Sequence, residues 1–184
     1  MLSTFITIAV IIAGIVLWII STQRRLVVLD ENISNAMSQI GVQLSSRFDA
    51  LTALLDLTKS YARHESETLI ETIKSRRSVI TAKSTPDEVM RQEGVISEAL
   101  CRIAMVTEQY PDLKANQNYI KTMDAVQTFE SMVRTSRLIY NDSVTKLNRE
   151  TRMFPVSMVS GMLGFDQREY LVEQADKADM PSMK

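Results

Sequence analysis

Residues 26–55 read LVVLDENISNAMSQIGVQLSSRFDALTALL, and this stretch decides the fold. Its spacing of apolar side chains, in steps of three and four residues, is typical of a helix that buries one stripe of its surface. The sequence therefore predicts an amphipathic helix with Gly41 as its weakest backbone position. The stripe consists of Leu26, Leu29, Ile33, Ala36 with Met37, Ile40, Leu44, Phe48, Leu51 and Leu55.

The twenty residues at the start of the chain contain no charge, and sixteen of them are apolar. A helix of that length spans roughly 30 Å, the hydrocarbon thickness of a bilayer. A secretory signal would have a basic start, a shorter apolar core and a small-residue cleavage site. We therefore predict a retained transmembrane helix with Trp18 at an interface. No second apolar run of comparable length follows, so the prediction is a single span.

The orientation of this span depends on two arginines. Arg24 and Arg25 follow the apolar run at once, and no Lys or Arg precedes it. The positive-inside rule then places the N-terminus outside the cell (inner) membrane and the rest of the chain in the cytoplasm. The single Cys101 is compatible with this reducing compartment.

Further helices can be placed from their start and stop signals. Residues 84–88, Ser-Thr-Pro-Asp-Glu, have the order of a helix N-terminus, and Tyr110-Pro111 ends that helix. A last long helix begins near Asn116 and ends at Phe154-Pro155. Residues 26–82, which include the first stripe and precede these helices, fit either one long helix or two. The expected buried positions of the two later helices are Val89, Ile96, Ala99 with Leu100, Ile103, Val106, and then Tyr119, Met123, Val126, Phe129, Val133, Tyr140, Val144, Leu147, Thr151 and Phe154.

Few helix breakers, short connections and no alternating strand pattern predict an all-α protein, with an N-terminal single transmembrane helix followed by an antiparallel up-and-down four-helix bundle. The predicted organisation is a transmembrane helix at 1–20, a juxtamembrane linker at 21–25 and a helical bundle at 26–172. A mobile tail follows at 173–184. The bundle includes an uncharged apolar segment at 154–165.

The composition excludes several classes of function. A net charge of -1 and a pI near 5.9 argue against a nucleic-acid-binding protein. The chain has no Gly-rich phosphate loop, no Gly-x-Ser-x-Gly elbow and no His-Glu-x-x-His motif. We therefore expect no enzymatic activity, no catalytic residues, no cofactor, no metal and no small-molecule substrate.

Two single residues deserve an expectation of their own. His64 is the only histidine, and one histidine beside Glu65, Glu67 and Glu71 cannot build a two-metal bundle site. We expect it to be solvated or hydrogen-bonded. Cys101 lies beside a stripe position, and we expect it to be buried and inert. The methionines near the stripes are expected to fill the core, at Met37, Met123, Met132 and Met153.

Two surface stretches are candidate contacts with membrane or partner. The first is a basic cluster at Lys74, Arg76 and Arg77, with Lys83 nearby; it either complements a helix C-terminus or binds anionic headgroups. The second is the apolar segment 154–165. It could close the end of the bundle, insert at the membrane interface or dock a partner. Its candidate contact residues are Phe154, Val159, Met162, Leu163 and Phe165.

Short stretches in this order resemble the LemA family of membrane-anchored helical proteins. They are Leu29-Asp30-Glu31-Asn32-Ile33, Ser38-Gln39-Ile40, Val42-Gln43-Leu44, Tyr61-Ala62-Arg63-His64-Glu65, Thr68-Leu69, Tyr110 to Asn116, Tyr140-Asn141-Asp142, Phe154-Pro155 and Gly164-Phe165. The chain departs from the family's usual residues at Met37, Gly41 and Thr52-Ala53, where Trp, Asp and a Pro-Asn pair are usual.

The resemblance implies a four-helix bundle behind one transmembrane helix and no enzymatic activity, and an association of some members with magnetosome membranes suggests membrane organisation. We expect a scaffold or interaction module at the lipid bilayer, with a protein partner or self-association. The alternatives are a single-span sensor that binds a small ligand or ion within the bundle, where Tyr61, Tyr119 and Tyr140 lie on the stripes, or a self-assembling protein that organises membranes.

Overall fold

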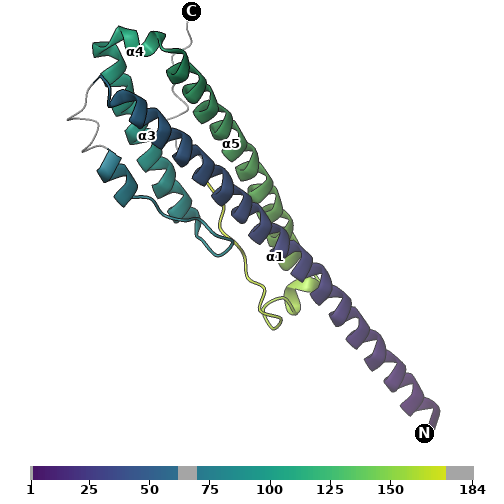
Figure 1. Cartoon of the computed structure of the whole chain (residues 1–184). Helices are drawn as coiled ribbons and strands as arrows, with labels where there is room; N and C mark the ends of the chain where they lie inside the picture. Colours follow the sequence, from purple (N-terminus) through teal and green to yellow (C-terminus); the bar gives the residue numbers. More distant parts are fainter. Residues whose placement is uncertain (1, 62–69, 173–184) are drawn as a thin grey trace, which may run out of the picture. The chain divides into compact units, whose positions relative to one another are not determined.

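The computed structural model describes residues 2–61 and 70–172 (Figure 1). This part of the chain is helical and contains no β-strand, so the all-α prediction is confirmed. The elements, with the labels of Figure 1, are α1 (Leu2–Thr58), α3 (Pro86–Gln109), α4 (Pro111–Ala115), α5 (Gln117–Arg152) and the 3-10 helix η1 (Val156–Met158). The expected tail at 173–184 lies outside the described residues.

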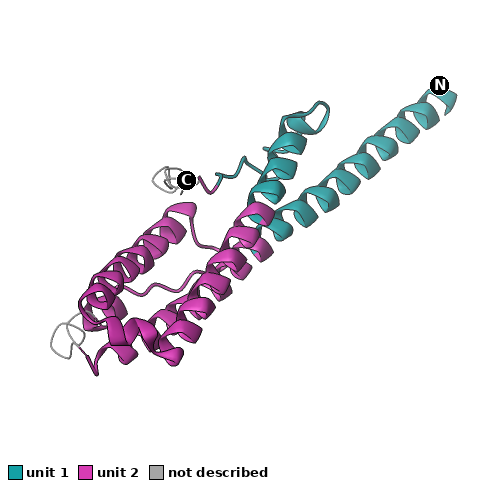
Figure 2. Ribbon diagram, turned by 90° about the horizontal axis from the view of Figure 1, so that it is seen from above, with its two compact units in different colours: residues 1–34, 140–170 teal, residues 35–139, 171–184 magenta. Residues whose placement is uncertain are grey.

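The contacts divide the chain into two compact units (Figure 2). Unit 1 contains residues 1–34 and 140–170, and unit 2 contains residues 35–139 and 171–184. Both α1 and α5 contribute residues to each unit.

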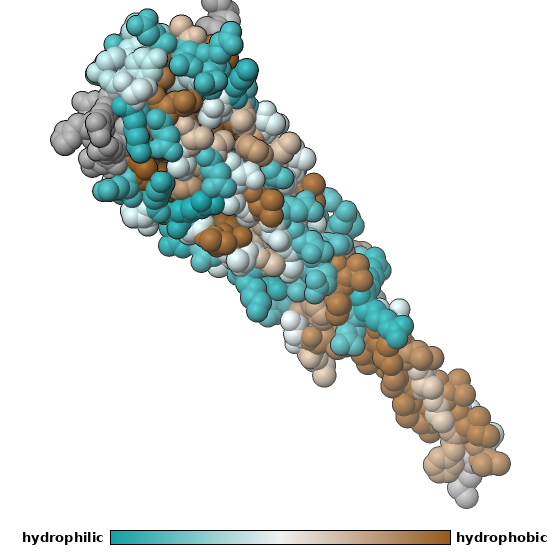
Figure 3. All heavy atoms as spheres, in the orientation of Figure 1, coloured by the Kyte–Doolittle hydropathy of each residue, from teal (hydrophilic) through white to brown (hydrophobic). Residues whose placement is uncertain are grey.

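The helix α1 is unbroken from Leu2 to Thr58, so residues 26–58 belong to one helix and residues 21–25 are helical turns. The predicted stripe is buried except at Leu29, which is half-buried: Ile40 and Leu51 have no exposed surface, and Leu26, Leu44 and Phe48 are 1% exposed. By length and composition, α1 contains one stretch able to cross a membrane, and none of that stretch is buried (Figure 3).

In unit 2, residues 35–58 of α1, α3 and residues 117–139 of α5 lie side by side (Figures 1 and 2). An ion pair of 3.0 Å joins Arg47 on α1 to Glu130 on α5, and the rings of Tyr61 and Tyr110, at the ends of α1 and α3, are 6.4 Å apart. The helices α1 and α3 therefore run in the same direction, and α5 returns after α4. This agrees with the predicted up-and-down order.

The arm between α1 and α3 differs from a long second helix. Of residues 70–83, only 70–75 are helical, and residues 77–81 have no regular secondary structure. Ile73 and Ile80 are buried at 4% and 7% exposure, so the arm still contributes to the core. The side-chain oxygen of Gln92 on α3 accepts hydrogen bonds from both the backbone N–H and the hydroxyl of Ser78, each at 2.8 Å. These contacts replace the backbone ladder that a helix would have supplied.

The helix α3 begins where the sequence predicts, and a capping box closes its N-terminus. The Thr85 hydroxyl accepts a hydrogen bond from the Glu88 N–H at 3.3 Å, and the Glu88 carboxylate accepts one from the Thr85 N–H at 2.8 Å. The bond from the Thr85 backbone, together with the Ser84 hydroxyl, lowers the pKa of Glu88. The expected core of α3 is buried at Val89, Ile96, Ala99 and Ile103.

The helix α5 also follows its predicted stripe, with Val126, Val133, Val144 and Leu147 at 1% exposure or less. The prediction fails at its end, because Phe154 is 79% exposed. The chain leaves the helix at Arg152, so Phe154 no longer follows the helical spacing. The core-filling role of methionine holds for Met37 at 2% exposure and is wrong for Met132 and Met153, which are 44% and 53% exposed. Met123 is half-buried.

Candidate functional site

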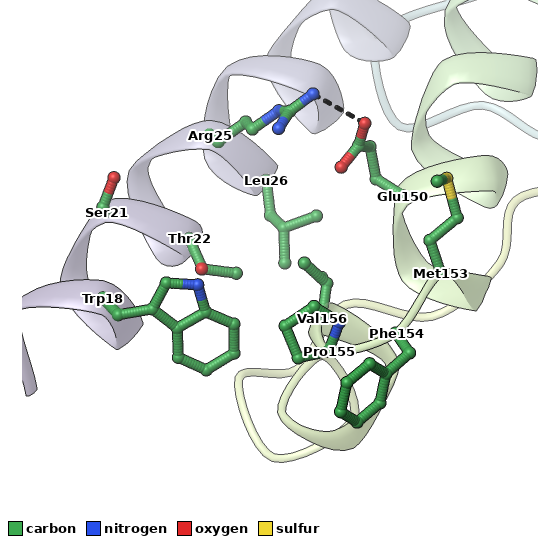
Figure 4. Close-up of a pocket in the computed structure, with 10 residues that line it drawn as sticks. All are labelled: Trp18, Ser21, Thr22, Arg25, Leu26, Glu150, Met153, Phe154, Pro155 and Val156. Atoms are coloured by element: carbon green, nitrogen blue, oxygen red, sulfur yellow. Dashed lines mark hydrogen bonds and ion pairs between the residues drawn. The ribbon is translucent and has the colours of Figure 1, made fainter. Parts of the chain in front are cut away.

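Within unit 1, the segment after α5 packs beside the end of the apolar run of α1. A pocket of about 400 Å³ separates them (Figure 4). Its lining side chains from α1 include Trp18, and those of the facing segment include Pro155 and Val156. The full lining is Trp18, Ser21, Thr22, Arg25, Leu26, Glu150, Met153, Phe154, Pro155 and Val156. The pocket is open, with Trp18 and Thr22 at one end and the Arg25–Glu150 ion pair at the other (Figure 4).

Ion pairs and hydrogen bonds hold the polar end of this site. Arg25 pairs with Glu150 at 2.7 Å, and Arg168 pairs with Asp30 at 2.8 Å, so α1 is joined both to α5 and to the chain near residue 168. Asn148 on α5 donates to the Arg168 carbonyl at 2.9 Å and accepts from the Arg168 N–H at 2.8 Å. Because Asn148 is buried, these two bonds fix the position of residues near Arg168.

Tyr140 adds a further hydrogen bond between α5 and the same segment. Its hydroxyl donates to the carbonyl oxygen of Glu169 at 3.0 Å, and its side chain is 4% exposed. Burial raises the pKa of Tyr140; nearby Arg168 opposes that shift, and Glu169 adds to it. The phenol therefore stays protonated and keeps its donor role over the physiological range.

The apolar candidate residues do not share one environment. Phe154 and Met162 are 79% and 88% exposed, so these two side chains do not close the end of the bundle, which is one of the three roles that the sequence leaves open. Val159, Leu163 and Phe165 are half-buried. The segment 154–165 therefore has an inner side, which packs on the rest of unit 1, and an outer side with large exposed apolar groups.

The predicted basic cluster lies in unit 2. Arg77 pairs with Asp49 at 2.8 Å, donates to the Ser45 hydroxyl at 2.6 Å, and its guanidinium lies 4.9 Å from the centre of the Phe48 ring. Arg76 pairs with Glu98 at 2.8 Å. Lys74 is exposed. The two arginines therefore link the arm to α1 and α3.

Sequence reasoning did not find the buried Arg47. Its side chain is 2% exposed, and its Nε has no hydrogen-bond partner among the described residues. Burial lowers its pKa, while Glu130 and Glu93 act in the opposite direction. Glu93 is itself paired with Arg137 at 2.8 Å. A signal was present: Arg47 is three residues after Leu44 and four before Leu51, which places it on the stripe.

The two single residues have different outcomes. Cys101 is exposed, so the expectation of a buried thiol is wrong; it lies two positions from each of the buried residues Ala99 and Ile103 of α3. His64 lies outside the described residues. Among the residues that the structure describes, no group of His, Cys, Asp and Glu could hold a metal ion.

Comparison with known proteins gives matches over most of the chain. Two relatives are Magnetosome proteins MamQ 1 and MamQ 2 of Paramagnetospirillum magneticum, each 24% identical over 80% of this chain. The chain matches 64% of the length of each of these relatives. A third is Protein LemA of Metamycoplasma hominis, which is 29% identical over 86% of this chain and 73% of its own length.

The family model for the LemA family matches residues 36–184, which leaves the apolar run outside the match. The match includes the whole arm, α3, α4 and α5, and the residues of the loop that follows. On this evidence the chain belongs to the LemA family.

Proposed function

We propose that this protein is a single-pass membrane protein whose helical bundle is a non-enzymatic scaffold or interaction module on the cytoplasmic side. The observation that carries the proposal is the exposed apolar surface of α1. Phe5, Ile11 and Leu17 are 69%, 57% and 68% exposed, within a stretch that has no charge. An apolar helix of this length is stable in hydrocarbon, whereas in water it would expose its whole surface.

The membrane anchor can be tested by placing charges in the apolar run. We expect the double variant Ile11→Lys, Ile15→Lys to disappear from carbonate-washed membranes, because each lysine at the centre of a span costs about 2.5–3.5 kcal/mol. The matched control is Val42→Lys, Val79→Lys, which adds the same charge at positions 60% and 80% exposed in unit 2. Retention of the first variant in washed membranes would contradict the anchor.

The orientation can be tested on the native thiol. Cys101 is the only cysteine and is exposed, so a membrane-impermeant maleimide reports which side of the membrane it faces. We expect no labelling in intact cells and full labelling after permeabilisation. Cys101→Ser is the control for labelling elsewhere. Labelling in intact cells would place the bundle on the outer side and contradict the positive-inside prediction.

The scaffold role can be tested by crosslinking the full chain in native membranes and identifying what is captured on the bundle by mass spectrometry. One reproducible partner, other than a second copy, supports the proposal. It is contradicted if a form that lacks residues 1–20 restores function in full, because a membrane scaffold needs its attachment.

The names of two relatives favour a second candidate. Both are called magnetosome proteins, and we propose as the alternative that this chain organises a membrane by self-assembly. Overexpression followed by electron tomography distinguishes the two candidates. Altered membrane morphology, with crosslinks only between copies of this chain, would favour membrane organisation over a scaffold for another protein.

A further inference from the structure

The loop formed by residues 153–163 has an apolar outer surface that no other described residue covers. Phe154, Met158 and Met162 are 79%, 68% and 88% exposed. The stretch from 154 to 165 contains no charged residue. Exposed apolar groups of this size, gathered on one loop, are typical of a contact site rather than of ordinary surface.

The loop lies at the end of the apolar run, within unit 1. Trp18 is near the last residue of that run, and its indole faces Pro155 and Val156 across the pocket (Figure 4). If α1 crosses a bilayer with Trp18 at the interface, then the loop beside Trp18 is at the same depth. The position of the loop therefore specifies its surroundings, which are headgroups and the upper acyl chains.

Exposed arginines follow the apolar run on α1 and precede the loop at the end of α5. Arg24 on α1 and Arg149 and Arg152 on α5 are exposed, and within the described ranges none of the three has an ion-pair partner. Arg149 and Arg152 also line a second open pocket in unit 1. An apolar tip with basic residues behind it matches the two layers of an anionic membrane surface.

The backbone of the loop is suited to an apolar environment. Its N–H groups are largely used within the loop: Ser157 donates to Met153, Ser160 to Val156 and Leu163 to Val159, each at 2.9 Å. Phe165 donates to Ser160 at 3.0 Å, and Gly164 between them has a φ of +79°, which favours glycine. Each of these internal bonds lowers the cost of moving the loop backbone out of water.

We propose that residues 153–163 form an interfacial segment that inserts Phe154, Met158 and Met162 into the bilayer beside the transmembrane part of α1. The inference rests on the proposed anchor and adds a second attachment to the membrane. Its partner is the lipid surface, because the loop is uncharged, is flanked by arginines and lies beside Trp18.

The test uses the full chain in lipid nanodiscs made of phosphatidylcholine and phosphatidylglycerol. In a Cys101→Ser background, an environment-sensitive fluorophore is attached at Met158→Cys or at Met162→Cys. The matched control is Val79→Cys, which is 80% exposed and apolar but belongs to unit 2. Because all three positions are exposed, the substitutions leave the core intact, and circular dichroism confirms the fold. Trp18 is the only tryptophan, so its own emission reports the anchor separately.

We expect the labels at 158 and 162 to emit at shorter wavelength and to be strongly quenched when the acyl chains are brominated, and the label at 79 to be unaffected. Quenching of Trp18 with no quenching at 158 and 162 overturns the loop insertion and leaves the anchor in place. Lack of Trp18 quenching overturns the anchor itself. Equal quenching at all three positions also contradicts insertion. So does an emission shift at 158 and 162 that depends on protein concentration and not on brominated lipid, because that result indicates contact with a second copy of the chain.

Discussion

Replacing Arg47 by alanine is expected to lower the free energy of unfolding of unit 2 by about 3 kcal/mol. The side chain is 2% exposed, so its removal leaves a cavity in the layer between Leu44 and Leu51. Its partner Glu130 is 42% exposed and can be solvated again, which limits the electrostatic part of the loss. Denaturant unfolding of the full chain in mild detergent, followed by circular dichroism, measures the change.

The variant Arg47→Met separates packing from charge. Methionine keeps an unbranched chain as far as the position of Nε and removes a buried guanidinium whose Nε is unpaired. Replacement of a buried ionic side chain by an apolar one of similar shape is often neutral, so we expect Arg47→Met to stay within about 1 kcal/mol of the unmodified protein. If it is as unstable as Arg47→Ala, the ion pair with Glu130, not the packing, stabilises this layer.

Replacing Gly41 by alanine is expected to lower the free energy of unfolding by about 1–3 kcal/mol. A Cβ at this position would overlap the carbonyl oxygen of Ile80 and lie 2.9 Å from its carbonyl carbon. Both atoms belong to the backbone of the arm, which cannot move aside as a flexible side chain would. The unfolding measurement described above for Arg47 gives the size of the loss.

The matched control is Gly94→Ala on α3, where a Cβ would meet nothing within 4 Å. There the substitution is expected to raise the free energy of unfolding by about 0.5–1 kcal/mol, because alanine loses less conformational entropy than glycine in a helix. Opposite signs at the two positions would support a close approach at Gly41. A gain in stability at both would show that the arm does not contact α1 there.

The helices were predictable because their signals are local. The stripe from Leu26 to Leu55 follows from helical spacing alone, and the capping box at Thr85 and Glu88 is a contact between residues three apart. The end of α3 at Gln109 follows from Pro111, which removes a donor from the backbone ladder. Such features need no knowledge of the neighbouring elements.

The remaining features depend on contacts between distant residues. The arm is held by Gln92 and by the absence of a side chain at Gly41, and neither is visible in the spacing of residues 70–83. Arg47 is on the buried stripe, yet its burial requires carboxylates on α3 and α5. The apolar loop was recognisable by composition, but only the fold shows that it lies beside Trp18.

Because α1 is one unbroken helix, no flexible joint separates its apolar run from the following residues of unit 1. Trp18, Thr22 and Leu26 follow each other at four-residue steps and so share one face of the helix. Because Leu26 and Trp18 share this face, the helix itself fixes which side of the apolar run faces the loop. Insertion of one residue between Ile20 and Arg25 would turn the run by about 100° and carry Trp18 away from Pro155 and Val156. The number of residues between Ile20 and Arg25 therefore sets the rotation of the apolar run about its own axis.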